Sequence, residues 1–185
     1  MSLIKLSILS FVVSFVGITA KANSISFKET LDQSKYSVFF LRHALAPGYG
    51  DPTDFNIDDC KTQRNLNSEG KDQARSIGTD LKSIGISFDK IYSSEWCRCT
   101  ETASLLNLGE VTTFSGLNSF FQNHYNRQET IAKLMNKLES LNKTGRVLMV
   151  THQVVISAIT GINVASGVAV AYNPSDGSAV KLSMR

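Results

Sequence analysis

The sequence contains few of the residues that mark specialised classes of protein. Its 185 residues include only 3 cysteines, 3 prolines and 1 tryptophan, and the formal net charge is only +3. So few cysteines exclude a disulfide-dense miniprotein, and a hydrophobic content of 42% excludes a disordered chain. Apart from one apolar run near the N-terminus there is no long hydrophobic segment, which excludes a protein with several membrane spans. The composition that remains is that of one globular domain.

The first residues have the pattern of a secretory signal peptide. Met1 to Lys5 carries one positive side chain, Leu6 to Ile18 is largely apolar, and Ala20-Lys21-Ala22 places small residues at a cleavage site. The apolar run is shorter than the roughly 20 residues of a membrane-spanning helix, so an uncleaved anchor is the less favoured alternative. We predict a signal peptide at residues 1–22 and a single domain at residues 23–185. The protein should then be periplasmic or secreted, without stable insertion into a membrane.

The charge of the expected mature chain is close to zero. The leader contains Lys5 and Lys21 and no acidic residue, so 17 basic and 16 acidic residues remain, which gives a net charge of +1. Proteins that bind nucleic acids usually have a strongly basic surface, and we therefore expect no nucleic-acid partner.

Export would place the three cysteines in an oxidising environment, where a disulfide can form. Cys97 and Cys99 are too close in sequence to bond comfortably to each other within a helix, so we expect Cys60 to pair with one of them. This bond would tie a long loop to the segment around Arg98 and stabilise the fold by roughly 3–4 kcal/mol. The Cys-x-Cys spacing does not match that of structural zinc sites, and we expect no metal.

Hydrophobic periodicity predicts strands that alternate with helices. Short apolar runs indicate buried strands, and apolar residues spaced along one face indicate amphipathic helices, the first of which begins at the N-cap residue Asn67. Asn173 to Gly177 predicts the turn of a hairpin. This order predicts a three-layer α/β/α fold with a mostly parallel sheet and a C-terminal hairpin. The predicted strands are 36–41, 90–93, 111–114, 147–150, 168–172 and 180–184, and the predicted helices are 67–84, 95–106, 131–141 and 154–160.

Two stretches lack this periodicity and are expected to be loops. Residues 46–59 are rich in glycine, proline and aspartate, and residues 120–127 combine aromatic with polar side chains. Phe120 and Phe121 in the second loop are expected to pack in the core, with the mouth of a substrate site as the alternative.

Two of the predicted strands end in a histidine. Residues 38–41 continue into Arg42-His43, and residues 147–150 continue into Thr151-His152. In open α/β sheets ligands bind beyond the carboxyl ends of the strands, so both histidines should reach the same crevice. The strand at residues 90–93 should deliver Arg98 to that edge on the first turn of the following helix.

Two arginines and two histidines in one crevice favour phosphoryl transfer. The planar guanidinium of arginine matches a pair of phosphate oxygens and keeps its charge. Like charge suppresses the protonation of a neighbouring histidine, which leaves a ring nitrogen free to attack phosphorus. The second histidine and the arginines would stabilise the charge on the transferred group. Because the arginines supply the countercharge, we expect no cofactor.

Four short motifs occur along the chain in a characteristic order. They are Leu41-Arg42-His43-Ala44, Leu66-Asn67-Ser68-Glu69-Gly70 with Gln73-Ala74, Tyr92-Ser93-Ser94 with Arg98 and Glu101-Thr102-Ala103, and Val150-Thr151-His152. In this order they resemble the histidine phosphatase superfamily, also called phosphoglycerate-mutase-like. The resemblance covers residues 36–160 and implies the fold of that family and the hydrolysis of a small phosphate ester. It also implies that His43 becomes phosphorylated, while Arg42, Arg98 and His152 hold the phosphate.

The sequence departs from the family at the proton donor. Many members carry an acid after the third strand, where this chain has Leu117-Asn118-Ser119, and others carry one after the second histidine, where it has Gln153. A donor from the long first loop and the absence of any donor both stay open, and without a donor aryl phosphates should react far better than alkyl phosphates. The candidate donors are Asp51, which is nearest to His43, Asp54, Asp58 and Asp59.

Together these patterns predict an exported phosphomonoesterase of the histidine acid phosphatase type. The alternative, suggested by the missing acid, is a catalytically impaired protein of the same fold that binds a phosphate ligand. The sequence does not indicate an oligomeric state or a physiological substrate.

Overall fold

The computed structural model describes residues 25–26, 29, 35–141 and 145–183, so the predicted signal peptide lies outside the described residues. The described strands are β1 (Ile25–Ser26), β2 (Val38–Arg42), β3 (Lys90–Ser93), β4 (Val111–Thr113), β5 (Val147–Thr151), β6 (Ala169–Tyr172) and β7 (Ala179–Ser183). The described helices are α2 (Ser68–Ser83), α3 (Cys97–Leu106), α4 (Arg127–Ser140) and α5 (Gln153–Thr160), with short 3-10 helices η1 (Cys60–Thr62), η2 (Ser115–Leu117) and η3 (Phe121–Asn123).

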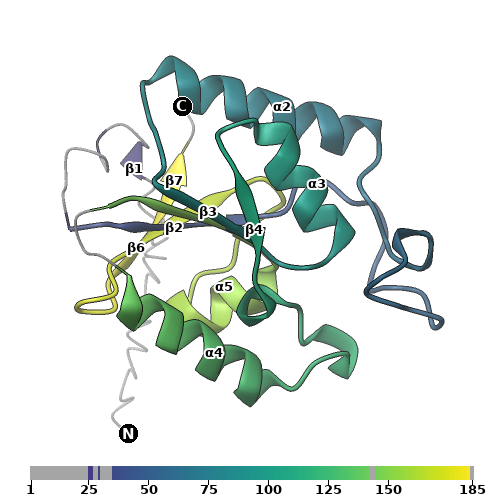
Figure 1. Cartoon of the computed structure of the whole chain (residues 1–185). Coiled ribbons are helices and arrows are strands. Elements are labelled where there is room, and N and C mark those ends of the chain that lie inside the picture. The colour runs from purple at the N-terminus through teal and green to yellow at the C-terminus, as the bar shows by residue number, and fades with distance from the viewer. Residues whose placement is uncertain (1–24, 27–28, 30–34, 142–144, 184–185) are drawn as a thin grey trace, which may run out of the picture.

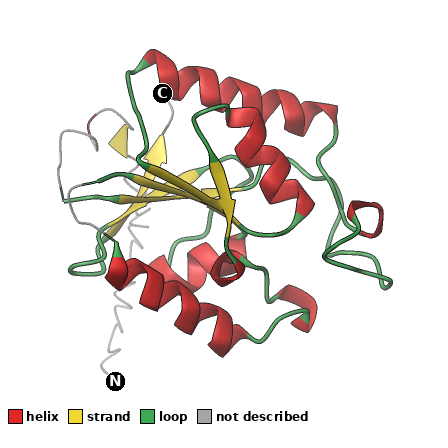
Figure 2. Ribbon diagram, in the orientation of Figure 1, coloured by secondary structure: helices red, strands yellow, loops and turns green. Residues whose placement is uncertain are grey.

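These elements form three layers, as the sequence predicts. The described strands lie in one sheet in the order β1-β7-β6-β2-β5-β3-β4, with α2 and α3 on one face and α4 and α5 on the other (Figure 1). Figure 2 shows the same layers, with helices above and below the strands. β2, β5, β3 and β4 are parallel, while β6 and β7 form an antiparallel hairpin beside β2. The mostly parallel sheet and the C-terminal hairpin are therefore confirmed.

No helix in the described ranges is long and apolar enough to cross a membrane.

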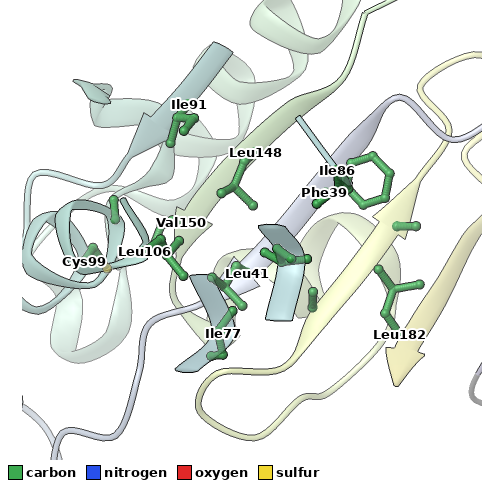
Figure 3. Packing of buried hydrophobic residues seen from close by; sticks show 14 of the residues in the cluster. Phe39, Leu41, Ile77, Ile86, Ile91, Cys99, Leu106, Leu148, Val150 and Leu182 are labelled. Carbon is green, nitrogen blue, oxygen red and sulfur yellow. The ribbon is translucent and has the colours of Figure 1, made fainter. Parts of the chain in front are cut away.

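Both faces of the central strands are buried. Successive side chains of a strand point to opposite faces, so Phe39 and Leu41 pack with Ile77 on the side of α2 and α3 (Figure 3). Phe40 packs with Leu134 in a second cluster on the side of α4. This double burial explains why β2 and β5 appear in the sequence as continuous apolar runs.

Two helix starts differ by two or more residues from the predicted ones. α3 begins at Cys97 instead of Glu95, because Trp96 has extended backbone angles (φ −61°, ψ 136°) and is the N-cap. α4 begins at Arg127, well before the predicted start at Ile131, because the side chain of Asn126 accepts a hydrogen bond from the backbone N–H of Glu129 at 3.1 Å. Part of the predicted second loop is accordingly helical.

The start of α2 packs closely against the loop that follows β2. Asn67 is the N-cap, as predicted, and its Oδ1 accepts a hydrogen bond from the N–H of Gly70 at 2.8 Å. A Cβ on Gly70 would lie 1.9 Å from the carbonyl oxygen of Leu45, so only glycine permits this approach. The N–H of Leu45 donates to Oε1 of Gln73 at 2.8 Å. These contacts fix the loop that carries His43.

Candidate active site

His43 and His152 lie next to each other at the ends of neighbouring strands. β2 and β5 pair in parallel with Arg42 opposite Thr151, so the residues that follow each strand face each other. The N–H of His43 donates to the carbonyl oxygen of Thr151 at 2.9 Å, and the two imidazole centroids are 5.5 Å apart. The sheet register brings together the two histidines that the strand endings single out.

Arg98 reaches the same place from the first turn of α3. Its Nη2 lies 3.4 Å from Nδ1 of His152, and its Nη1 and Nη2 donate to Asp51 Oδ1 and Oδ2 at 2.7 and 3.1 Å. Asp51 also accepts hydrogen bonds from Trp96 Nε1 at 3.1 Å and from the N–H of Arg64 at 3.0 Å. The side chains of Arg98 and Asp51 are 3% and 4% exposed. Asp51 therefore fixes the orientation of the Arg98 guanidinium.

The guanidinium of Arg42 is held by two hydrogen-bond acceptors. Its Nη1 donates to Gln153 Oε1 at 2.8 Å and to the carbonyl oxygen of Val164 at 2.7 Å. Gln153 occupies the position at which the resemblance places an acid in other proteins, and here its neutral amide orients an arginine. Gln153 is itself positioned by Asn163, which accepts a hydrogen bond from its Nε2 at 3.1 Å.

Arg64 is a third arginine at the site, and it is not among the site residues predicted from the sequence. Its guanidinium donates to the carbonyl oxygens of Gly50 (2.8 Å) and Ala46, and it lines the same cavity as His43. One signal was available: Arg64 comes shortly before the N-cap Asn67, and the loop that leads into this helix starts from the carboxyl end of β2, where ligands bind.

These residues line a cavity of about 470 Å³. Three guanidinium groups with the carboxylate of Asp51 leave a net charge of +2 around it, which matches a phosphate dianion. Among the described residues, the Nε atoms of Arg42 and Arg98 are buried and make no hydrogen bond. The charged or titratable lining residues are Arg42, His43, Tyr49, Arg64, Arg98 and His152, with no Asp or Glu among the described lining residues.

The geometry of His43 defines its tautomer. Nδ1 lies 2.7 Å from the carbonyl oxygen of Ala44, which can only accept, so Nδ1 carries the proton and Nε2 has a free lone pair. Burial, assisted by the charge of Arg98, lowers the pKa of His43 to about 3. His43 is therefore a neutral imidazole at physiological pH, which is the form required of a nucleophile.

His152 is also neutral. Burial and then the charge of Arg98 lower its pKa well below the ordinary value. Its Nε2 lies 3.0 Å from Ser94 Oγ, which in turn donates to Oδ1 of Asn118 at 3.1 Å. Because the hydroxyl proton of Ser94 goes to that amide oxygen, Nε2 of His152 donates to Ser94 and Nδ1 accepts from Arg98.

The structure does not bring the candidate proton donors into the cavity. Asp51 is occupied by Arg98, whose hydrogen bonds and charge outweigh the opposing effect of burial and lower the pKa of Asp51. Asp54 and Asp58 are exposed, and Asp59 caps η1 by accepting from the N–H of Lys61 at 2.9 Å. The pairing with Arg98 argues against Asp51, the candidate nearest to His43 in sequence, as a donor.

The disulfide joins Cys60 to Cys97, which selects one of the two predicted alternatives. It links the loop that carries Asp51 and Arg64 to the first residue of α3. Cys99 is free and buried, with its Sγ 3.4 Å from Nε2 of His152. Burial raises the pKa of the Cys99 thiol to about 12, so it is not a nucleophile at neutral pH.

Comparison with known proteins supports the resemblance to this family. Residues 38–127 match the family model of the histidine phosphatase superfamily (branch 1). Among curated proteins, none matches the chain by sequence.

Solved structures show the same fold. A putative alpha-ribazole-5'-P phosphatase from Escherichia coli is 19% identical, with a TM-score of 0.55 over 78% of this chain and 93% of that one. A putative phosphohistidine phosphatase SixA from Agrobacterium tumefaciens is 19% identical, with a TM-score of 0.53 over 75% and 91%. The protein histidine phosphatase SixA complexed with tungstate is 16% identical, with a TM-score of 0.54 over 78% and 92%.

Proposed function

We propose that the chain is a phosphomonoesterase that forms a phosphohistidine intermediate on His43. The observation that carries this proposal is the state of His43: its Nδ1 proton is held by the carbonyl of Ala44, which leaves the Nε2 lone pair free beside Arg42 and Arg98. A neutral nucleophile surrounded by fixed positive charge is suited to attack a phosphate dianion.

In the first step Nε2 of His43 attacks phosphorus. The N–P bond forms while the bond from phosphorus to the ester oxygen breaks, and the electron pair of that bond leaves with the oxygen. Arg42, Arg64 and Arg98 bind the three other phosphate oxygens, whose charge they offset as the transferred group passes through its transition state. His152 completes the wall of the phosphate site and supports Arg98 through its Nδ1.

In the second step a water molecule attacks phosphorus from the side that the leaving group has vacated. The N–P bond breaks, its electron pair returns to Nε2, and the water proton passes to solvent as inorganic phosphate forms. Each step replaces one bond to phosphorus with another, so residues of this chain can carry out the hydrolysis without an added cofactor.

A phosphate-release assay over a panel of phosphomonoesters tests the proposal. The His43→Ala variant should release no phosphate, and the wild-type protein should carry an acid-labile phosphate on His43 after rapid quenching. His124→Ala is the matched control, because His124 packs against Phe55 outside the cavity and the variant should keep its turnover. Full activity in His43→Ala would refute the mechanism.

A protein that binds a phosphate ligand without turnover is the second candidate. It is favoured by the lack of any carboxylate among the described residues of the cavity wall. Such a protein would bind inorganic phosphate or vanadate, lose that binding in Arg42→Ala and Arg64→Ala, and release no phosphate from any ester in the panel. Turnover of even one ester that depends on His43 excludes it.

We also propose that residues 1–22 are a signal peptide and that residues 23–185 form the mature periplasmic or secreted domain. The Cys60–Cys97 disulfide supports this, because such bonds persist in oxidising compartments. N-terminal sequencing of the protein recovered outside the cytoplasm should begin at Asn23. Recovery of the protein only from the cytoplasm, with its first 22 residues intact, would contradict export.

A further inference from the structure

Tyr49 is a large aromatic side chain at the cavity wall that is almost fully exposed. Its relative exposure is 88%, and it lines the cavity together with Arg42 and His43. Gly48 and Gly50 on either side have positive φ angles of 95° and 70°, so a tight Gly-Tyr-Gly turn presents the ring. A ring left in water at this position gains nothing from burial, and its faces are available to a ligand.

Phe121 supplies a second ring at the same opening. The Tyr49 and Phe121 centroids are 5.2 Å apart at an interplanar angle of 86°, and both residues line the cavity. We call this pair the aromatic rim. Of the two roles considered for the phenylalanines of this segment, Phe120 packs against the core cluster around Leu134 and Phe121 takes the place at the mouth.

The aromatic rim is held in place by Gln122. Its Oε1 accepts from the N–H of Asp51 at 2.7 Å, and its Nε2 donates to the carbonyl oxygen of Asp51 at 3.3 Å. A Cβ on Gly50 would lie 2.6 Å from that Oε1. Gln122 itself has φ 60° and ψ 16°, a left-handed conformation that a non-glycine residue keeps only where its surroundings require it. The two rings are therefore preorganised, and Asp51 links them to Arg98.

The side chains that line the cavity restrict which leaving groups a phosphate ester can have. Within the described part of the chain, no carboxylic acid lines the cavity that could protonate an ester oxygen. An aryl oxygen departs as a phenolate without a proton, whereas an alkyl oxygen departs as a far more basic alkoxide. The same leaving group offers an aromatic ring that can stack against Tyr49 and Phe121.

We propose that Tyr49 and Phe121 form a subsite for an aromatic leaving group, so that the substrates are aryl phosphate monoesters. This proposal rests on the proposed phosphomonoesterase function. When Nε2 of His43 takes the phosphoryl group, the P–O bond breaks with its electron pair on the aryl oxygen. The phenolate leaves past the rim and takes a proton from solvent, and water then releases the phosphate from His43.

The test separates ring recognition from leaving-group basicity. It compares phenyl phosphate with a fluoroalkyl phosphate whose alcohol has the same pKa as phenol, and the readout is the ratio of the two kcat/KM values. A stacked aromatic ring is expected to raise this ratio to about tenfold in the wild-type protein. Tyr49→Ala should lower the ratio toward one, mainly through the KM of phenyl phosphate, and Tyr49→Phe should keep it.

Met135→Ala is the matched control, because Met135 is a partly exposed hydrophobic residue on α4 outside the cavity, and its ratio should equal that of the wild type. A wild-type ratio of one, or an unchanged ratio in Tyr49→Ala, would overturn the subsite. Comparing phenyl phosphate with a phosphotyrosyl peptide then distinguishes a small-molecule from a protein source of the ring.

Binding of a non-hydrolysable ligand tests the subsite even where the proposed function fails. If the wild-type protein hydrolyses no ester, the phosphomonoesterase proposal is wrong, and calorimetric titration with phenylphosphonate and methylphosphonate takes the place of kinetics. If phenylphosphonate binds more tightly than methylphosphonate, and Tyr49→Ala abolishes this difference, the result supports the aromatic rim as a subsite. Equal affinity for the two phosphonates would overturn it.

Discussion

Asp51 is the residue whose role in the structure differs most from its expected one. Its carboxylate forms two hydrogen bonds with Arg98 and accepts a third from Trp96 Nε1, and it is almost fully buried. A buried carboxylate in this position stabilises the guanidinium and fixes its direction, and it stays ionised because Arg98 lowers its pKa. Asp51 is a positioning residue for Arg98.

Asp51→Asn should lower activity on every leaving group by the same factor. The amide keeps the size of the side chain but removes its charge, which leaves Arg98 buried without a countercharge and should lower the free energy of unfolding by about 3 kcal/mol. Rates on an aryl and an alkyl phosphate, together with urea unfolding, measure both effects. A proton donor would behave differently: its loss would slow the alkyl ester selectively, and that result would contradict the positioning role.

The residues at the strand ends are predictable from the sequence, whereas of the residues in the long loop Arg64 is not, and Asp51 is predicted only as a candidate proton donor. His43, His152 and Arg98 are specified by local patterns, because each lies directly after a short apolar strand or on the first turn after one. Arg64 and Asp51 belong to a segment without periodicity, so their positions depend on contacts formed only in the folded chain. The pairing of Asp51 with Arg98 has a sequence separation that no local pattern describes.

The loop between β2 and α2 is part of the candidate active site and is anchored at several points. It supplies Tyr49, Asp51 and Arg64, and the disulfide joins its Cys60 to the start of α3. Phe55 of the same loop stacks on Trp96 at a centroid distance of 4.9 Å. The disulfide therefore constrains a loop whose conformation determines the directions of the Arg64 and Arg98 side chains.

Removing the disulfide should weaken both stability and substrate binding. The double variant Cys60→Ser/Cys97→Ser is expected to lose about 4 kcal/mol of unfolding free energy, because the unfolded chain regains the entropy of an open loop. Its KM should rise, since Arg64 and Asp51 are less firmly held. Urea unfolding and steady-state kinetics measure these changes.

Reductant provides the matched control for that variant. It should shift the unfolding midpoint of the wild-type protein toward that of the double variant and leave the double variant unchanged. Equal midpoints for oxidised and reduced wild-type protein would contradict the stabilising role of the bond.

Predicted elements were most accurate where a single local signal determined a boundary. The N-cap Asn67 marks the start of α2 correctly, and the apolar run at residues 147–150 marks all but the last residue of β5. The predicted start of α3 was wrong because the backbone of Trp96 is extended. Its indole stacks on Phe55 and donates a hydrogen bond to Asp51. That arrangement comes from tertiary contacts, which helix propensity does not include.

Burial and positive charge at the candidate active site also make the stability of the whole fold sensitive to acid. Burial and the charge of Arg98 lower the pKa of both His43 and His152, whereas in the unfolded chain a histidine titrates near 6.5. Below pH 6.5 the unfolded state binds protons that the folded state does not, so the free energy of unfolding falls as the pH falls. For His43 this loss continues until the pH reaches its folded pKa of about 3.

His43→Asn should reduce this sensitivity. Between pH 7 and pH 5 the wild-type protein is expected to lose about 2 kcal/mol more unfolding free energy than the variant, because the variant lacks one group that protonates on unfolding. Urea unfolding at the two pH values measures the difference. An identical loss in both proteins would show that His43 is protonated in the folded state as readily as in the unfolded state.

The turn of the β6–β7 hairpin lies at the end of the strands opposite to the candidate active site. Tyr172 lies opposite Val38 at the start of β2, whereas His43 follows its other end, and residues 175–177 of the turn are exposed. Exposed turn tips accept inserted residues with little loss of stability. A fluorophore or an affinity label attached at this turn would report on folding and allow immobilisation while the candidate active site stays open to solvent.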